Sequence, residues 1–159
     1  MNKKKLISYL AEKIAQELTA ITEAAKNTYD VATHEDNKPE NKYDTRGLEA
    51  SYLAGAQAKR VVDMKEVLAI FENLPIKNFT ENDKITATAL VEVLLNDKTS
   101  FVLLMPKGGG QTVIFEDQSV QVITPESPLG KSLIGRLVGD VVVLEAGQKK
   151  REYEIVSIY

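Results

Sequence analysis

Apolar residues recur every three or four positions through the first 32 residues of the chain, the spacing of one helical face. The pattern is close to a heptad from Leu6 to about Ala32, and neither proline nor glycine interrupts it. A helix of about 27 residues is roughly 40 Å long and needs a packing partner along its length. Its expected apolar positions are Ile7, Leu10, Ile14, Ile21, Ala24 and Val31, with Glu17 and Thr28 as weak positions.

A second helical pattern runs from about Thr45 to Leu74, where Pro75 ends it. Two helices of similar length joined by a short polar loop form an antiparallel hairpin. A compact bundle is the alternative, but no third helix of matching length follows, so we expect the hairpin to protrude. The expected apolar stripe of the second helix is Leu48, Tyr52, Leu53, Ala56, Val61, Met64, Leu68, Phe71 and Leu74.

The segment between the two helices is strongly polar and acidic. Residues 34–44 read HEDNKPENKYD and hold four carboxylates, Glu35, Asp36, Glu40 and Asp44. In a hairpin these carboxylates lie at the far end of the rod, so they either form an ordinary solvated loop or carry charge to a distant site. His34 is the only histidine, and we expect it to be a surface residue because no second histidine or serine completes a catalytic group.

The periodicity changes after a linker at Ile76–Lys84. Short β-branched segments follow, separated by turn signals at Asn96-Asp97 and Gly108-Gly109-Gly110. The triple glycine lacks a phosphate-binding framework and no helical pattern follows it, so we expect a flexible hairpin turn. The expected strands are Ile85–Leu95, Thr99–Met105, Thr112–Phe115, Ser119–Thr124, Val141–Leu144 and Glu152–Tyr159.

One short helix is expected inside this β region. Ser127 suits its N-cap, Pro128 its first position, and Gly135 its stop. The sequence therefore predicts an α+β fold in which a helical hairpin at 1–75 precedes a linker at 76–84. A small, mostly antiparallel β domain with one short helix occupies 85–159.

Composition excludes several classes of protein. The chain has 159 residues, 43% of them hydrophobic, which is enough for a packed core. A net charge of −3 argues against a protein that coats nucleic acid or binds anionic membranes. Without cysteine, disulfides and thiol catalysis are excluded. No apolar run is long enough to cross a bilayer, and Glu12 and Lys13 interrupt any signal core, so we expect a cytoplasmic protein.

The run SPLGKSLIGRLVGDVVVL at 127–144, closed by YEIVSIY at 153–159, resembles the bacterial transcript-cleavage factors GreA and GreB. Their C-terminal domain carries a pattern like SPxxxALxGKxxGDxVxV and a last strand ending in YxIxxIxY. The order of a helical hairpin before an FKBP-like domain also matches, and PENKYD at 39–44 looks like a divergent form of the family's tip segment. The positions that fit in register are Ser127, Pro128, Leu133, Gly135, Gly139, Asp140, Val141, Tyr153, Ile155, Ile158 and Tyr159.

The resemblance implies a factor that binds bacterial RNA polymerase at its secondary channel and has no complete active site of its own. Carboxylates at the hairpin tip, here Asp36 and Glu40 with Glu35 and Asp44, would help to hold a Mg²⁺ ion at the polymerase active site and stimulate cleavage of backtracked RNA. The ion would be bound only in the complex with polymerase, and the protein would interact with nascent RNA and DNA only indirectly, through polymerase. The turn Glu126-Ser127-Pro128 would contact the rim of the polymerase channel.

The tip departs from the family pattern. Aligning Glu40 with the family's tip glutamate places Asn37 where an acidic residue is usual, and an amide is a much weaker ligand for Mg²⁺. Pro39 replaces a serine, although Asp36 or Glu35 substitutes if the loop shifts. Stimulation of cleavage and channel binding without cleavage, as an inhibitor or modulator, therefore both stay open.

Two other functions are weaker. A prolyl isomerase needs an aromatic-lined pocket, whereas most C-terminal aromatic residues should lie in the core. A coiled-coil interaction module unrelated to polymerase suits the hairpin but leaves the C-terminal pattern unexplained.

Tyr52 has two possible roles, stacking on a nucleotide or packing across the hairpin, and packing is expected.

Overall fold

The computed structural model describes residues 1–34, 46–146 and 149–159. They form two compact units. Residues Ile7–Asn73 form a helical unit, and Met1–Leu6 join Leu74–Tyr159 in a sheet unit. The first six residues thus belong with the sheet unit although helix α1 begins within them, at Lys3. The fold is α+β, as the sequence predicts.

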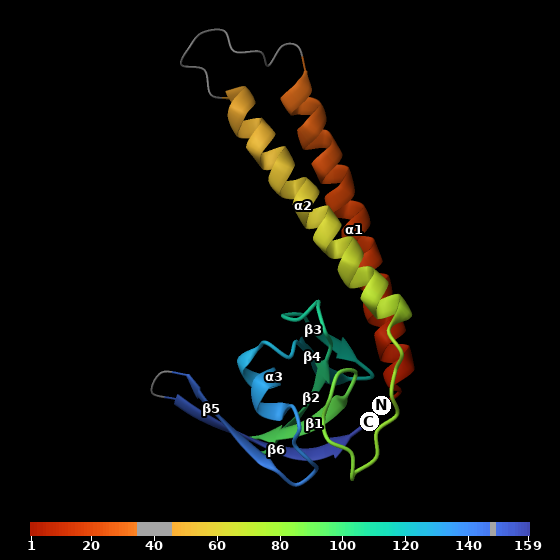
Figure 1. The fold of residues 1–159 in the computed structure, drawn as a ribbon, viewed down its shortest axis with the longest axis vertical. Helices are drawn as coiled ribbons and strands as arrows, with labels where there is room; N and C mark the ends of the chain where they lie inside the picture. The colour runs from red at the N-terminus through yellow and green to blue at the C-terminus, as the bar shows by residue number, and fades with distance from the viewer. Residues whose placement is uncertain (35–45, 147–148) are drawn as a thin grey trace. The chain divides into compact units, whose positions relative to one another are not determined.

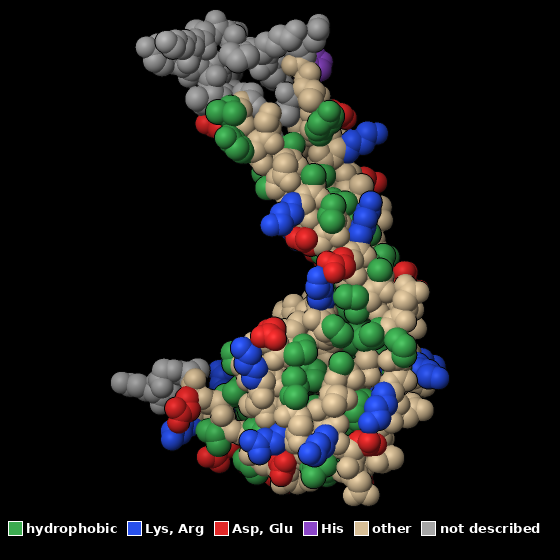
Figure 2. Space-filling model, in the orientation of Figure 1, with side chains coloured by type: hydrophobic (Ala, Val, Ile, Leu, Met, Phe, Trp, Pro, Cys, Tyr) green, Lys and Arg blue, Asp and Glu red, His purple; other side chains and the backbone are tan. Residues whose placement is uncertain are grey.

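The helical unit is a hairpin of α1 (Lys3–Thr33) and α2 (Arg46–Asn73), which run side by side in opposite directions (Figure 1). Glu17 Oε1 and Arg60 Nη2 are 3.1 Å apart and join the middles of the two helices. Acidic and basic side chains are interspersed along the face of the hairpin seen in Figure 2. Charge is therefore not concentrated on that face of the described helices.

The seam of the hairpin is narrower than expected. In α1 the half-buried positions continue through Leu18, Ile21 and Ala25, while Ala24, an expected apolar contact, is exposed. In α2 the seam passes through small or polar side chains at Ala54 and Gln57 before larger apolar residues follow. The half-buried α2 positions among the described side chains are Ala54, Gln57, Val61, Met64, Val67, Leu68 and Ile70.

The first half of the expected α2 stripe was therefore wrong. Leu48, Tyr52, Leu53 and Ala56 are exposed, and the exposed fraction of Tyr52 is 72%. Two paired helices cover one stripe at alternating three- and four-residue steps, and these four residues lie off the stripe through Ala54. The prediction that Tyr52 packs across the hairpin is wrong for the same reason.

The sheet unit contains six strands in the order β3-β4-β2-β1-β6-β5 (Figure 1). All neighbouring pairs are antiparallel except β2 and β4, which run parallel. This parallel pair was not predicted. The strand bounds are β1 Leu90–Leu95, β2 Lys98–Leu104, β3 Thr112–Phe115, β4 Gln118–Ile123, β5 Val141–Ala146 and β6 Lys149–Ile158.

The triple glycine does not form a hairpin turn, because β3 pairs with β4 and not with β2. It lies in the crossover that carries the chain from β2 past β4 to β3. The two-residue turns have a different composition. Asn96 and Asp97 have φ of 49° and 60°, and Glu116 and Asp117 have φ of 49° and 61°. Positive φ at both central residues is typical of a tight β-hairpin turn.

Strand β1 begins at Leu90, five residues later than expected. Ile85 instead exchanges main-chain hydrogen bonds with the segment after α3. The N–H of Ile85 donates to the carbonyl of Arg136, and the carbonyl of Ile85 accepts from the N–H of Gly135. The chain then turns through Thr88, whose φ is 69°. Ile85 is fully buried, which explains its apolar character without strand pairing.

The core of the sheet unit lies between one face of the sheet and helix α3 (Pro128–Leu133). Alternate residues of the strands supply it, as expected from the two-residue repeat of a strand. Its buried members are Phe79, Ile85, Ala89, Val91, Val93, Val102, Leu104, Ile123, Leu129, Leu133, Val142, Tyr153, Ile155 and Ile158.

Candidate functional site

The four tip carboxylates predicted from the sequence, Glu35, Asp36, Glu40 and Asp44, lie outside the described residues. His34, at the end of α1, is described and exposed. Within residues 1–34, 46–146 and 149–159, no three His, Cys, Asp or Glu side chains are grouped so that they could hold a metal ion. The proposed metal-assisting role of the tip therefore stays a prediction from the sequence.

The second predicted site, the turn Glu126-Ser127-Pro128, is well defined. Ser127 is the N-cap of α3, with an extended backbone (φ −66°, ψ 152°). Its Oγ accepts a hydrogen bond from the N–H of Gly130 at 3.1 Å and donates one to the carbonyl of Thr124 at 2.7 Å. Pro128 occupies the first turn of the helix. The cap and stop chemistry predicted for this helix is confirmed, and Gly135 has the positive φ expected after a helix end, 78°.

Gly130 permits this turn. A Cβ added to it would lie 2.0 Å from the carbonyl oxygen of Thr124 and 2.9 Å from Ser127 Oγ. No side chain fits there, so the backbone of α3 passes directly over the end of β4. Leu129 and Leu133 then enter the core. Two hydrogen bonds, a close backbone contact and two buried leucines hold the turn rigidly.

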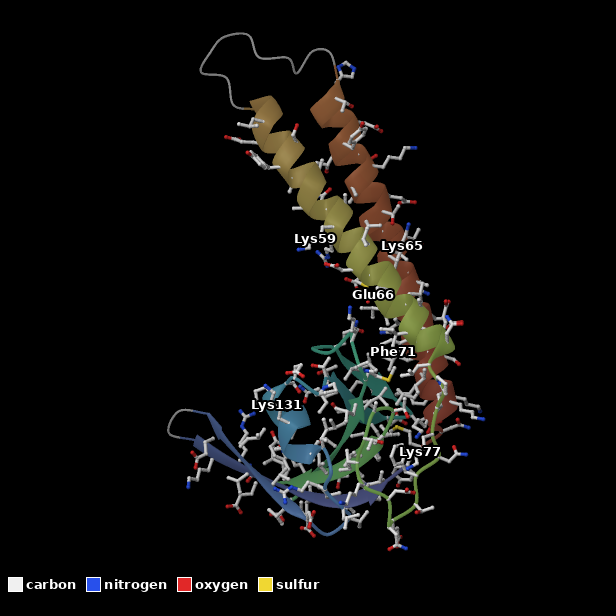
Figure 3. The ribbon with its side chains drawn as sticks, in the orientation of Figure 1. Lys59, Lys65, Glu66, Phe71, Lys77 and Lys131 are labelled. Carbon is white, nitrogen blue, oxygen red and sulfur yellow. The ribbon has the colours of Figure 1, made fainter. Side chains whose placement is uncertain are left out.

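The side chains around the turn face solvent. Glu126 Oε2 lies 3.5 Å from Lys131 Nζ, and both side chains are largely exposed. Lys131 is on α3 (Figure 3). An exposed pair contributes little to stability, about 0–1 kcal/mol. The turn therefore offers a partner a carboxylate, a lysine and a proline on a rigid frame.

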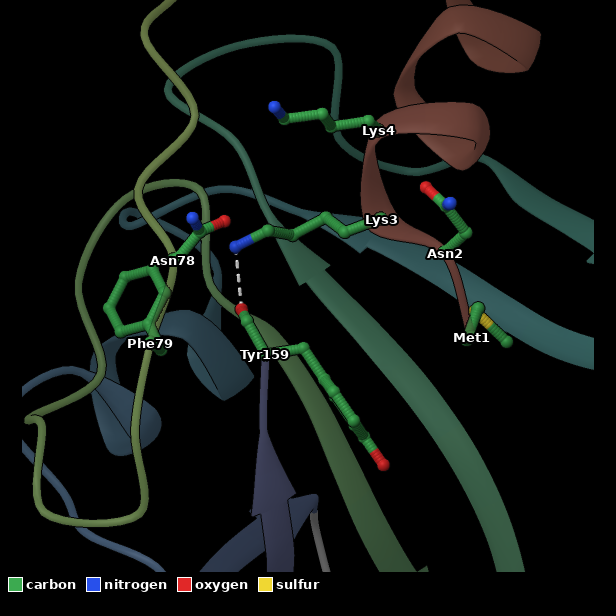
Figure 4. A pocket seen from close by; sticks show the side chains of 7 residues that line it. All are labelled: Met1, Asn2, Lys3, Lys4, Asn78, Phe79 and Tyr159. Carbon is green, nitrogen blue, oxygen red and sulfur yellow. Dashed lines mark hydrogen bonds between the residues drawn. The ribbon is translucent and has the colours of Figure 1, made fainter.

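A third group of functional interest was not anticipated from the sequence. Lys3 is only 7% exposed. Its Nζ donates to the main-chain oxygen of Tyr159 at 2.6 Å and also to that of Lys77. It lies 4.7 Å from the ring centroid of Phe79. Figure 4 shows Lys3 reaching from the start of α1 to Tyr159 at the end of the sheet. One side chain thus joins three separate segments of the sheet unit.

The surroundings of the Lys3 ammonium disfavour its charged form. Burial, with repulsion from Lys77 as a second cause, lowers the pKa of Lys3 from 10.5 to about 8. Lys77 Nζ lies 4.6 Å from the centroid of the same Phe79 ring and contacts Asp83 Oδ1 at 2.8 Å. A pocket of about 320 Å³ adjoins this group, lined by Met1, Asn2, Lys3, Lys4, Asn78, Phe79 and Tyr159 (Figure 4).

Asp83 fixes the loop that carries Phe79. Its carboxylate accepts hydrogen bonds from Lys77 Nζ and from the N–H and Oγ1 of Thr80. The hydrogen bond from Lys77, followed by those from Thr80, lowers the pKa of Asp83 from 3.8 to about 2. The sequence signals the turn through TENDK, but it does not show that a buried lysine depends on it.

Comparison with known families identifies the C-terminal half of the chain. Residues 80–159 match the family model "Transcription elongation factor, GreA/GreB, C-term". The chain therefore belongs to the GreA/GreB family of transcription elongation factors. None of the helices in the described parts of the chain combines the length and apolar character needed to span a bilayer.

The individual relatives include proteins named as elongation factors and proteins named as transcription inhibitors. Transcription elongation factor GreA of Thermotoga sp. is 29% identical over 107 residues, which cover 65% of this chain and 63% of that protein. Transcription inhibitor protein Gfh1 of Thermus thermophilus is 26% identical over 153 residues, covering 94% of this chain and 90% of the relative. A crystal structure of Thermus thermophilus Gfh1 is similar at 23% identity and a TM-score of 0.38, with 94% of each chain covered.

Proposed function

We propose that this protein binds bacterial RNA polymerase through the secondary channel and acts on backtracked elongation complexes as a regulatory factor. The family match at residues 80–159 carries the proposal, and the helical hairpin supports it. Helix α1 alone has 31 residues, which corresponds to roughly 46 Å at about 1.5 Å per residue. In this proposal the length of the helix allows the hairpin to carry the tip carboxylates into the channel.

The docking element of the proposal is the turn Glu126-Ser127-Pro128. Its support is the rigid cap of α3, which holds Pro128 and the exposed pair of Glu126 and Lys131 in a fixed arrangement. A pre-organised surface binds with a smaller loss of conformational freedom than a flexible one.

The tip chemistry gives the proposal its mechanism. Asp36 and Glu40, with Glu35 and Asp44 nearby in sequence, supply carboxylate oxygens, the ligands that Mg²⁺ prefers. A Mg²⁺ ion bound between tip and polymerase would activate water for hydrolysis of the RNA. The role of this chain's own residues is to place negative charge at a site that the polymerase completes.

A second candidate function is inhibition without cleavage. Asn37 stands at a position where the family pattern expects an acidic residue, and Lys38 and Lys42 add positive charge beside the carboxylates. The similarity to Gfh1, whose name describes a transcription inhibitor, favours the same alternative. In this case the hairpin occupies the channel but leaves the polymerase without an additional metal ligand.

Association with polymerase is the first test. Purified bacterial core RNA polymerase should co-elute with the full chain in size-exclusion chromatography, and a GreA protein should displace it. A Glu126→Ala/Pro128→Ala double variant should bind at least about fivefold more weakly. Glu81→Ala, an exposed carboxylate in the loop before β1, is the matched control and should bind as the wild type does. No association at all would refute the proposal.

A further inference from the structure

On β5, the face of the sheet opposite the core carries two exposed apolar side chains, Val141 and Val143. Residues directly opposite each other in a ladder share a face. Val141 pairs with Glu154 and Val143 with Glu152, and Glu154 pairs with Leu94. These five residues therefore lie together on the face opposite the core, which contains Val142, Tyr153 and Val93. We call them the outer sheet surface.

The outer sheet surface is apolar in the middle and acidic around it. Val141 is 54% and Val143 47% exposed, large fractions for strand valines. Leu94 is half-buried between them and β2, and Glu152 and Glu154 are exposed. The surface is hollowed by a pocket of about 250 Å³, lined by Leu94, Asn96, Asp97, Val141, Glu152 and Glu154.

The charges on this face are mostly unbalanced within the described residues. Lys150 shares the face by register but contacts Glu145 at 3.2 Å. Glu152, Glu154 and Asp97 form no ion pair of 4.0 Å or less among those identified in the described parts of the chain. Three carboxylates thus surround an apolar hollow, beside a paired lysine.

We propose that the outer sheet surface docks a basic segment of a protein partner. A lysine or arginine side chain has an apolar stem and a cationic head. Its stem suits Leu94 and Val141, and its head suits Glu152, Glu154 and Asp97. Alternating basic and apolar residues on the partner would match the valines and carboxylates together.

Charge complementarity selects this occupant over the others. Nucleic acid and anionic membranes are repelled by the three carboxylates. A second copy of the chain would place the same acidic surface against itself in a two-fold pair, and like charges in contact oppose that arrangement. The proposal does not depend on polymerase binding through the turn before α3, which lies on the core side of the sheet.

The test uses the full ¹⁵N-labelled chain and NMR titration at low ionic strength. The probe is an acetylated, amidated octapeptide of alternating lysine and valine. We expect it to shift the amides of Leu94, Asp97, Val141, Glu152 and Glu154. Binding should weaken as salt is added, because exposed charges are screened. An octapeptide of alternating glutamate and valine should leave these amides unchanged.

Variants of the outer sheet surface test which of its side chains bind the peptide. Glu152→Lys/Glu154→Lys should weaken binding about tenfold or more, and the milder Glu152→Gln/Glu154→Gln should weaken it in the same direction, since each exposed ion pair is worth up to about 1 kcal/mol. Val141→Ser/Val143→Ser should also weaken it. Glu81→Lys, the same type of substitution at an exposed position in a loop, should not. Equal binding by the glutamine variant and the wild type, or shifts of these amides by oligouridine or phosphatidylglycerol vesicles, would overturn the proposal.

Discussion

The backbone of Gly130 passes so close to Thr124 that a Cβ on this glycine would lie 2.0 Å from the Thr124 carbonyl oxygen. This contact sets the start of α3 against the end of β4. It also fixes Ser127, whose Oγ bridges the same carbonyl and the N–H of Gly130. The conformation of the predicted docking turn therefore depends on Gly130, a buried residue of α3.

Replacement of Gly130 by alanine should destabilise the sheet unit by about 1–3 kcal/mol, the usual cost of forcing extra volume into a packed site. Urea unfolding followed by circular dichroism measures the loss. Lys131→Ala, one residue along the same helix and exposed, is the control and should stay within about 0.5 kcal/mol of the wild type. A Gly130→Ala protein as stable as this control would show that the contact relaxes without cost.

Lys3 predicts a dependence of stability on alkaline pH. Its pKa falls from 10.5 to about 8 in the folded protein, so between these values the unfolded chain binds more protons at this site. Stability contributed by this group therefore rises as pH increases from about 8 to 10.5. Comparison of the wild type with Lys3→Met over this range should show the wild type gaining stability relative to the variant.

The control for this comparison is Lys5→Met, which removes an exposed lysine from the same helix. This variant shows how much of any change comes from the loss of a lysine charge near the start of α1 and not from the buried position of Lys3. A parallel pH profile for Lys3→Met and the wild type would contradict the environment described for Lys3.

Asp83 predicts a dependence at acid pH with the same sign, so that stability again rises with pH. Its pKa is lowered from 3.8 to about 2 by the hydrogen bonds from Lys77 and Thr80. Its contribution to stability is therefore present above about pH 4 and is lost as pH falls toward 2. The ¹³C shift of the Asp83 carboxyl carbon should titrate near 2 in the wild type and distinctly higher in Lys77→Met. The same midpoint in both proteins would exclude Lys77 as the main cause.

Replacement by serine should destabilise the protein to very different extents at two of its tyrosines. Tyr153 is 8% exposed and belongs to the core of the sheet unit, so Tyr153→Ser should cost about 3 kcal/mol or more. Tyr52 is exposed on α2, and Tyr52→Ser should change stability by less than about 0.5 kcal/mol. Thermal unfolding of both variants distinguishes the two positions. A large loss for Tyr52→Ser would place this tyrosine in a packed interface.

The local chemistry of the C-terminal half was largely predictable from the sequence, because each signal there is short-range. Ser127, Pro128 and Gly135 start and stop α3 as their residue types indicate. The order of the strands was not predictable, since the parallel pairing of β2 with β4 depends on contacts between distant segments. For this reason the triple glycine was assigned to the wrong kind of turn.

The same difference between short-range signals and contacts of distant segments applies to the candidate sites. The buried position of Lys3 depends on Lys77, Phe79 and Tyr159, which are 74 or more residues away in the sequence. No local pattern marks a lysine of this kind, and the sequence alone suggests a solvated basic start. The exposure of Tyr52 was missed because apolar residues off the seam of a two-helix hairpin look the same in sequence as those on it.

Action on backtracked polymerase is tested most directly with a stalled, backtracked elongation complex of bacterial RNA polymerase, by sizing the RNA after addition of the protein. The protein should bind the complex and change its reaction. Mg²⁺-dependent shortening of the RNA, lost in Asp36→Ala/Glu40→Ala but kept in the control Glu12→Ala/Glu23→Ala, would establish a cleavage factor. Inhibition of GreA-stimulated shortening, without shortening by the protein alone, would establish the inhibitor. Neither effect, with no binding to polymerase, would contradict the account.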